Sequence, residues 1–168
     1  LPAFPHSIAL SRIEQELGAP ADQLFEEFPS APIAAASLGQ VYKARLEGQS
    51  WVAVKVQRPN LTFILRRDLV LIRALGVLTA PFLPLNLGFG LGSIIDEFGR
   101  SLFEEIDYEQ EADNAERFAT LFVDNPAVYV PRVERMLSST RVLTTTWIEG
   151  SKMRNSQELI DQRLDPAA

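Results

Sequence analysis

The chain has no cysteine, and this absence excludes disulfide bonds, thiolate metal sites and cysteine nucleophiles. Only one histidine is present, His6, which follows Pro5 near the N-terminus. Its place beside the prolines of the terminus argues against a histidine-based triad or a histidine-rich metal site, and we expect His6 to lie in a surface loop. Lysine is scarce too, since the 16 basic residues include only Lys43, Lys55 and Lys152. A lysine inside an apolar strand then needs an explanation.

The net charge of -6 and the lack of any run of basic residues argue against a nucleic-acid-binding protein, because phosphate backbones are bound by clusters of Lys and Arg. The 168 residues, 46% of them apolar and 23% charged, are typical of one soluble globular domain. Residues 1–5 lack the basic segment and the apolar run of a signal peptide. Because the chain begins without Met and ends in Asp165-Pro166-Ala167-Ala168, we expect it to be a piece of a longer protein.

Apolar periodicity and turn residues predict helices followed by a sheet. Ser7 is a suitable cap for the first helix, Gly18 ends it, and the turn at 47–50 joins two antiparallel strands. We expect helices over residues 7–17, 21–28, 61–79, 93–122 and 155–163, and strands within 33–57 and over 129–133 and 141–147. This order predicts an α+β fold with an antiparallel sheet.

The most apolar stretch of the chain covers residues 69–95. Arg73 near its start and the prolines and glycines between residues 80 and 93 argue against a regular helix that spans a membrane. Two alternatives stay open for this stretch. It could pack inside the protein, or it could form a surface patch that faces a membrane.

Lys55 lies in an apolar run of residues 51–56 that is typical of a β-strand. Strand alternation places Lys55 on the same face as Trp51 and Ala53, opposite the three valines. A buried ammonium group needs an anionic partner. We interpret this strand as packed against the core on one side and presenting a cation to a cleft on the other. The alternative is an edge strand whose lysine reaches solvent.

Small residues at positions 34–37 precede the first strand of this pair. Pro32 before them and Gly39 after them leave room for one helical turn at most. A loop of small residues lets the backbone approach a phosphate closely, although alanine does not tolerate positive φ as glycine does. We therefore expect a stiff loop over a ligand. Tight packing of small side chains under a helix is the alternative.

Acidic residues are dense within the expected helix 93–122. Helical spacing places Glu111 in an otherwise apolar row, and Glu105 continues a second apolar row. A carboxylate on a buried face needs a cationic partner, for which Lys55 is the candidate. We expect the remaining acidic residues to form a solvated face, and the spacing around Asp107 does not by itself indicate a metal site.

Three segments, in this order and spacing, resemble the UbiB/ADCK family of atypical kinase-like proteins, also called the AarF-domain family. They are Ala34–Tyr42, Val52–Pro59 and Glu105–Asn114. The resemblance implies the small, N-terminal lobe of a protein kinase: an antiparallel sheet of about five strands, a long helix like kinase helix C, and additional N-terminal and inserted helices. The implied divisions are a helical extension at 1–30, the lobe at 31–150 and the start of a truncated C-lobe at 151–168.

The resemblance also implies roles for particular residues. Lys55 looks like the strand lysine that contacts ATP phosphates, and Glu111 looks like its partner on helix C. Glu105 and Asp107 look like the family's Glu-x-Asp motif, which meets a Lys-x-Gly-Gln motif on an upstream helix. The residues implied to surround the nucleotide lie in the alanine-rich loop, the Lys55 strand and the hinge: Ala34, Ala35, Ala36, Ser37, Gly39, Gln40, Val41, Ala53, Lys55, Thr146, Trp147 and Ile148.

The chain departs from the family pattern because it lacks Lys-x-Gly-Gln, which would precede Leu1. It also lacks the catalytic-loop Asp and Asn and the Asp-Phe-Gly motif, which would follow Gly150. The implied cofactor is ATP or ADP with Mg²⁺, whose ligands belong to that later lobe, so this piece alone is expected to be inactive. No metal ligand is assigned within the chain.

The family resemblance implies that the complete protein is an atypical kinase or ATPase supporting prenyl-quinone metabolism, with ubiquinone or a plastoquinone-type product. Implied partners are nucleotide, membrane lipid or prenyl-quinone intermediates, and quinone-biosynthesis proteins. The implied location is peripheral to a membrane, in the bacterial cytoplasm or in an organelle. Two other functions stay open: a non-enzymatic module that binds lipid or quinone through residues 69–95, and a scaffold in which Lys55 and Glu111 are purely structural.

Overall fold

The computed structural model describes residues 2–79 and 91–150. The helices are α1 (His6–Leu17), α2 (Ala21–Leu24), α3 (Leu61–Thr79), α4 (Leu91–Glu105) and α5 (Tyr108–Leu121), with a 3-10 turn at Arg135–Leu137. The strands are β1 (Ala34–Ala35), β2 (Gly39–Arg45), β3 (Trp51–Gln57) and β4 (Val142–Thr146). The expected helix at 155–163, the start of a C-lobe at 151–168 and part of the apolar stretch lie outside the described residues.

The four strands form one antiparallel sheet in the order β1-β2-β3-β4. The predicted α+β class and the hairpin between β2 and β3 are confirmed, and Gly48 and Gln49 make its turn with positive φ angles of 86° and 68°. Within the described residues the sheet has four strands instead of about five. The expected strand at 129–133 is reduced to one bridge between Val133 and Thr145. Pro131 explains this difference, since it has no N–H for a ladder.

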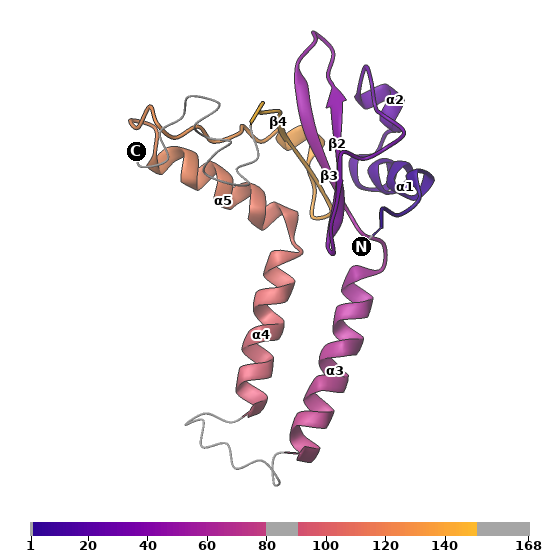
Figure 1. Cartoon of the computed structure of the whole chain (residues 1–168), viewed down its shortest axis with the longest axis vertical. Coiled ribbons are helices and arrows are strands. Elements are labelled where there is room, and N and C mark those ends of the chain that lie inside the picture. Colours follow the sequence, from indigo (N-terminus) through magenta and orange to yellow (C-terminus); the bar gives the residue numbers. More distant parts are fainter. Residues whose placement is uncertain (1, 80–90, 151–168) are drawn as a thin grey trace, which may run out of the picture.

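One face of the sheet forms the core with the N-terminal helices, which lie on one side of it in Figure 1 while α5 lies on the other. Tyr42, Val52, Val54 and Val56 are 0–1% exposed and pack with Ile13 of α1. His6 is part of this packing and not of a surface loop, because it opens α1 and its ring lies 6.0 Å from that of Phe28. The face with Lys55 is the one toward α5, which covers it only in part; it is called the open face because the N-terminal helices do not cover it.

The expected single helix at 93–122 is wrong, because it is two helices with a break at residues 106 and 107. Asp107 caps α5, and its side-chain oxygen accepts a hydrogen bond from the Glu109 amide at 3.0 Å. An Asp side chain that bonds the backbone in this way favours a helix start over a helix interior. The expected helix at 21–28 is also shorter, since the amides of Glu26 and Glu27 bond to the Arg45 carbonyl at the end of β2.

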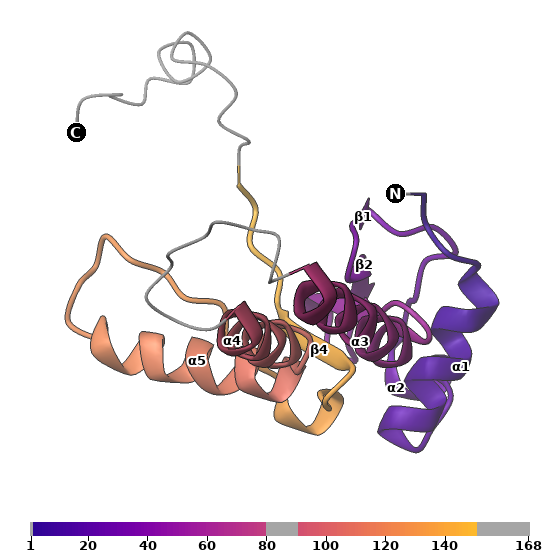
Figure 2. The same ribbon diagram turned by 90° about the horizontal axis from the view of Figure 1, so that it is seen from below.

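Helices α3 and α4 form an antiparallel pair that projects from the sheet, and Figure 2 shows the pair end-on between α5 and α1. Leu69 of α3 packs over Gly99 of α4, where a Cβ added to the glycine would lie 3.2 Å from the nearest side-chain atom of Leu69. Arg73 of α3 forms an ion pair with Asp96 of α4. Much of α3 is exposed nonetheless, with Val70 at 68% and Leu75 at 60%. The described part of the apolar stretch 69–95 on α3 is therefore largely a surface and not packed inside the protein. No helix among the described residues has the length and apolarity needed to cross a bilayer.

Candidate functional site

The site is built on the sheet face opposite α1. Alternation along β3 leaves Ala53 and Lys55 half-buried on this face and buries Val52, Val54 and Val56 on the other, as the sequence predicts. Lys55 lies opposite Val41 of β2 and Leu143 of β4. Lys55 therefore stands on one of the two central strands and projects from the open face.

Lys55 and Glu111 form an ion pair between β3 and α5. Lys55 Nζ donates to Glu111 Oε2 at 2.6 Å, and the two side chains are 31% and 42% exposed. The structure thus brings together the strand cation and the helix carboxylate that the sequence singles out. Because water still reaches both groups, an anionic ligand can reach the Lys55 ammonium as well.

A hollow of about 210 Å³ lies under the alanine-rich loop. The residues that line it are Ala34, Ala35, Ala36, Ser37, Leu38, Gly39, Val41 and Lys55. The loop is a tight hairpin, because Ala34 and Ala35 pair with Val41 and Gln40, and the Ala36 amide bonds to the Gly39 carbonyl at 2.8 Å. The loop and the lysine therefore line one cavity. A ligand in it would meet the lysine cation on one side and the loop backbone on the other.

Arg58 anchors the tip of this loop, a role that the sequence pattern does not reveal. Its guanidinium donates to the carbonyl of Ala36 at 3.0 Å and to that of Ser37 at 3.2 Å, while its amide donates to that of Leu38 at 2.8 Å. These bonds hold the loop over the end of β3. The position of the arginine directly after the apolar strand does not by itself indicate this contact.

Gly39 allows the loop, β3 and α5 to meet. A Cβ at this position would lie 2.6 Å from the Val56 carbonyl oxygen and 2.7 Å from the Tyr108 hydroxyl oxygen, so no larger residue fits without a shift. Tyr108 is fully buried, and the centre of its ring lies 4.5 Å from Lys55 Nζ. Burial, together with the charge of Glu111, raises the pKa of Tyr108. The sequence pattern indicates no role for Tyr108, because the contact between Tyr108 and Lys55 exists only in the folded chain.

Glu105 and Asp107 lie outside the hollow that contains Lys55. Glu105 is exposed at the end of α4. Asp107 caps α5 and lines a different hollow of about 220 Å³, together with Gln57 and Thr140. The structure therefore does not bring this predicted pair of carboxylates to the Lys55–Glu111 pair.

The side chain of Gln40 points away from the hollow. It is fully buried on the α1 side of the sheet, where its Oε1 accepts from the Phe4 amide at 3.0 Å and its Nε2 donates to the Phe4 carbonyl at 3.4 Å. Its neighbours on β2 alternate accordingly, so only Gly39 and Val41 face the loop cavity. Gln40 attaches the N-terminal segment to the sheet.

The predicted hinge lies beyond β4, at the other end of the open face. Thr146 Oγ1 accepts from the Arg132 amide at 2.9 Å, the Trp147 amide donates to the Trp51 carbonyl at 2.9 Å, and Ile148 is exposed. Ala53 stands opposite Thr145 in the sheet. It lies on the same face as Lys55, between the lysine and the hinge. The hinge residues do not line the loop cavity.

A cluster of aromatic and charged side chains closes this end of the sheet. Lys43 Nζ bonds to Glu149 Oε1 at 2.8 Å and lies 5.0 Å and 4.7 Å from the ring centres of Trp51 and Trp147. Trp147 Nε1 also donates to Glu149 Oε1, at 2.7 Å. The hydrogen bond from Lys43 and then that from Trp147 lower the pKa of Glu149.

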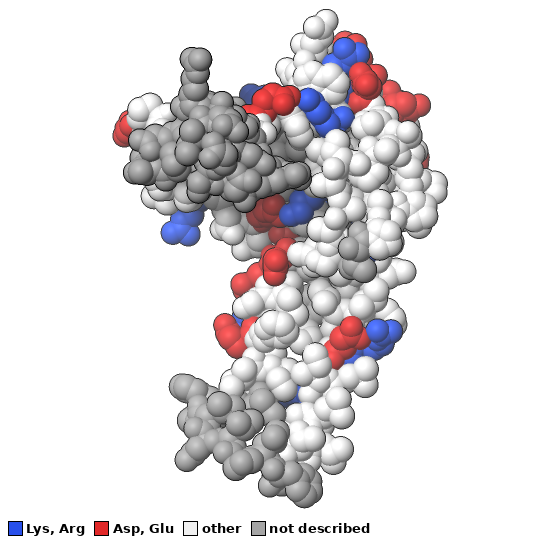
Figure 3. Space-filling model, viewed as in Figure 1, with Lys and Arg blue, Asp and Glu red and all other residues white. Residues whose placement is uncertain are grey.

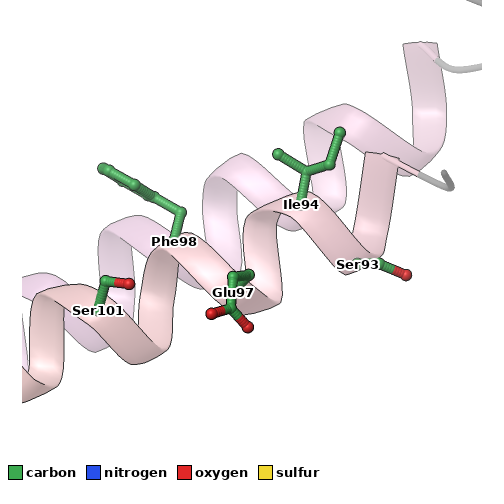
Figure 4. Close-up of a pocket in the computed structure, with 5 residues that line it drawn as sticks. All are labelled: Ser93, Ile94, Glu97, Phe98 and Ser101. Carbon is green, nitrogen blue, oxygen red and sulfur yellow. The ribbon is translucent and has the colours of Figure 1, made fainter. Parts of the chain in front are cut away.

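A larger hollow of about 460 Å³ lies along α4, away from all of these residues. Its described lining comes from α4 alone, and Figure 4 shows Ile94 and Phe98 projecting from one side of the helix and Glu97 from another. This lining offers no cation for a phosphate. We therefore place the candidate site at the smaller hollow that contains Lys55.

Comparison with known proteins gives consistent matches over the chain. The family described as the ABC1 atypical kinase-like domain matches residues 1–168. The chloroplast protein ACTIVITY OF BC1 COMPLEX KINASE 1 of Arabidopsis thaliana is 43% identical over 98% of this chain and 24% of its own length. A probable protein kinase UbiB of Pseudomonas paraeruginosa is 33% identical over 98% of this chain and 31% of its own length. The chain thus spans less than a third of each of these two relatives.

A solved structure has the same arrangement. The protein Rv3197 of Mycobacterium tuberculosis, in complex with erythromycin, aligns with a TM-score of 0.74 and 35% sequence identity. The alignment covers 90% of this chain and 38% of that protein's chain. The fold described above is therefore the fold of a solved relative.

Proposed function

Because the chain belongs to the ABC1 atypical kinase-like family, as its resemblance to UbiB/ADCK proteins predicted, we propose that its sheet and helix α5 are the ATP- or ADP-binding half of an atypical kinase or ATPase. One observation carries the proposal. Lys55, which is ion-paired with Glu111, lines a hollow roofed by small residues. This is the arrangement of the phosphate-binding end of a kinase small lobe.

The residues present fit the phosphate groups of a nucleotide. Lys55 supplies a cation that its partner Glu111 keeps oriented, and the alanine-rich loop lets the backbone come close to an anion. The base would extend along Ala53 toward the hinge at 146–148. Within residues 2–79 and 91–150, no cluster of three or more His, Asp or Glu side chains could hold a metal ion. Since the chain spans less than a third of the two relatives, we propose that the Mg²⁺ ligands and the catalytic aspartate belong to another part of the complete protein and that this piece is inactive alone.

The chemistry proposed for these residues is binding and orientation. Lys55 neutralises charge on the phosphates, Glu111 fixes the lysine, and Arg58 keeps the loop closed over the cavity. Each of these contributes by positioning, which together with charge stabilisation accounts for most of phosphoryl-transfer catalysis. Mg²⁺, when bound, would supply positive charge that neutralises the charge developing on the phosphates.

Calorimetric titration of the full-length protein with ADP tests this proposal. We expect Lys55→Met to lower ADP affinity by about tenfold or more, since a charge-assisted phosphate contact is lost. Arg67→Met is the matched control, because Arg67 is an exposed cation paired with Asp68 on α3. A wild-type protein without measurable affinity for ADP or ATP would overturn the proposal.

We further propose that the complete protein supports prenyl-quinone metabolism, which its similarity to a UbiB protein supports. To test this, cells that lack the protein are complemented with the wild-type gene or with a gene that carries Lys55→Met. Their prenyl-quinones are then measured by chromatography. We expect the variant to restore less quinone than the wild type. Full restoration by Lys55→Met would favour the scaffold alternative, in which the ion pair is purely structural.

The outer face of α3 favours a second role, peripheral contact with a membrane. Phe63, Val70, Leu71, Leu75 and Leu78 are 55–69% exposed along this helix, and Figure 3 shows few charged side chains on its side of the helix pair. The charged residues of α3 are three arginines and one aspartate, in a chain whose net charge is negative. An apolar helix face with basic residues suits the interface of an anionic bilayer.

Co-sedimentation with vesicles distinguishes this role. The full-length protein should sediment more with phosphatidylcholine–phosphatidylglycerol vesicles than with phosphatidylcholine alone. Substitution of Leu71, Leu75 and Leu78 together by Gln should abolish the difference, while Met136→Gln, at a residue 93% exposed elsewhere, should not. Equal sedimentation of the triple variant and the wild type would remove α3 as the contact.

A further inference from the structure

Two groups on successive turns of α5 hold the ammonium of Lys55. Its Nζ lies 2.6 Å from Glu111 Oε2 and 4.5 Å from the centre of the Tyr108 ring. Residues three apart on a helix lie on the same face, so the carboxylate and the ring meet the cation from one element. The ion pair is only half of what surrounds this ammonium.

We propose that Tyr108 is a positioning residue whose ring face keeps the Lys55 ammonium directed at the nucleotide hollow. This inference rests on the proposed nucleotide site. Glu111 is 42% exposed, whereas Tyr108 is 0% exposed. The aromatic ring is thus the buried neighbour of the lysine, and the carboxylate is the neighbour that water also reaches.

The ring has no space to swing away from Lys55, because the Tyr108 side chain is fully buried and its backbone is bonded. The Tyr108 amide donates to the Thr140 carbonyl at 3.1 Å, which joins the start of α5 to the turn before β4. At the other end, the hydroxyl oxygen lies against the backbone of Gly39 under the alanine-rich loop. A shift of the ring would therefore displace either the loop or the helix start.

The hydroxyl of Tyr108 does not share in this role. It is buried and has no hydrogen-bond partner among the described residues. Its removal in Tyr108→Phe takes away no bond and leaves the ring face in place. The ring and the hydroxyl therefore have different roles: the ring contacts Lys55, and the hydroxyl does not.

The test measures the reactivity of Lys55 in the full-length protein without nucleotide. An N-hydroxysuccinimide ester acylates lysines, and peptide mass spectrometry compares Lys55 with Lys43 as the internal reference. Replacing Tyr108 by 3,4,5-trifluorophenylalanine keeps the ring shape but withdraws electron density from its face. We expect the acylation of Lys55 relative to Lys43 to rise about two- to fivefold in this variant and to stay at the wild-type value in Tyr108→Phe.

Two outcomes would overturn the proposal. Acylation of Lys55 at the wild-type value in both variants would mean that the ring face does not act on the cation. An equal increase in both variants would assign the effect to the loss of the hydroxyl. Both variants keep the aromatic ring, and equal thermal unfolding midpoints check that they are folded.

ADP titration of the same variants separates this inference from the proposed function. If nucleotide binds, the fluorinated variant should bind ADP more weakly than Tyr108→Phe, which should match the wild type. If the wild type binds no nucleotide, the proposed function fails, but the acylation ratio still decides whether the ring positions Lys55.

Discussion

Lys55 Nζ and Glu111 Oε2 lie 2.6 Å apart although 56 positions separate the two residues in the sequence. Packing of Tyr108 and Ala112 against Leu143 and Val133 already attaches α5 to the sheet. An ion pair of two partly exposed side chains adds at most about 1 kcal/mol to stability. Its importance is therefore in orientation and not in holding the fold together.

Glu111→Gln removes the charge of the carboxylate and keeps its shape. We expect ADP affinity to fall about tenfold because Lys55 loses its charged partner. The free energy of unfolding should change by less than about 1 kcal/mol. Calorimetry and urea unfolding give the two values, and a large loss of stability with unchanged affinity would mean that the pair is structural.

Glycine substitutions in the roof of the hollow test whether the loop contacts phosphate. Ala35→Gly and Ala36→Gly increase the range of backbone conformations that the loop can adopt, so that its amide groups are held less firmly. We expect the ratio of ATP affinity to ADP affinity to change in favour of the triphosphate by about threefold. Nucleotide affinities that stay the same in both variants would show that the loop does not touch the phosphates.

Gly39→Ala tests the close approach of loop, strand and helix. The added methyl group would overlap the Val56 carbonyl and the Tyr108 hydroxyl, so stability should fall by about 1–3 kcal/mol. Gly92→Ala is the matched control, since nothing lies within 4 Å of its Cβ position and alanine favours the helix. Urea unfolding measures both, and a Gly39→Ala protein as stable as the wild type would contradict the packing described here.

The Lys43–Glu149 contact should depend on pH. Hydrogen bonds from Lys43 and Trp147 lower the pKa of Glu149 below its ordinary value of 4.5. Above pH 4.5 the Glu149 carboxylate is therefore ionised and keeps its contacts with Lys43 and Trp147. These contacts are lost as the pH falls through the lowered pKa. Trp51 and Trp147 are the two tryptophans of the chain, and Lys43 lies close to both rings.

Tryptophan fluorescence measures this transition. We expect a constant signal from neutral pH down to 4.5 and a change below it, and we expect Glu149→Gln to show the acid signal at every pH. A wild-type signal that changes only above pH 4.5, or one that Glu149→Gln leaves unaltered, would assign the fluorescence to another group.

Local rules predicted the parts of the fold that depend on one strand or one turn. Alternation along residues 51–56 placed Lys55 on the open face, and the glycine turn gave the hairpin, because both depend on neighbouring residues. Helical periodicity continues through residues 106 and 107, so it could not show that Asp107 starts a second helix. Pro131 was the available reason to doubt the strand at 129–133.

The candidate site was predictable only in part. Lys55 and Glu111 were identified because a charge in an apolar row needs a partner. The anchoring of the loop by Arg58, the contact of Gly39 with Tyr108 and the burial of Gln40 depend on how β1, β3 and α5 meet. No pattern along the chain contains that information.

The projecting pair of α3 and α4 has a consequence for the two charged groups. It begins four residues after β3 ends and finishes three residues before α5 begins, so residues 61–105 connect the strand of Lys55 to the helix of Glu111. A change in how α3 and α4 pack against each other would therefore act on β3 and α5 together, the two elements that carry the ammonium and the carboxylate.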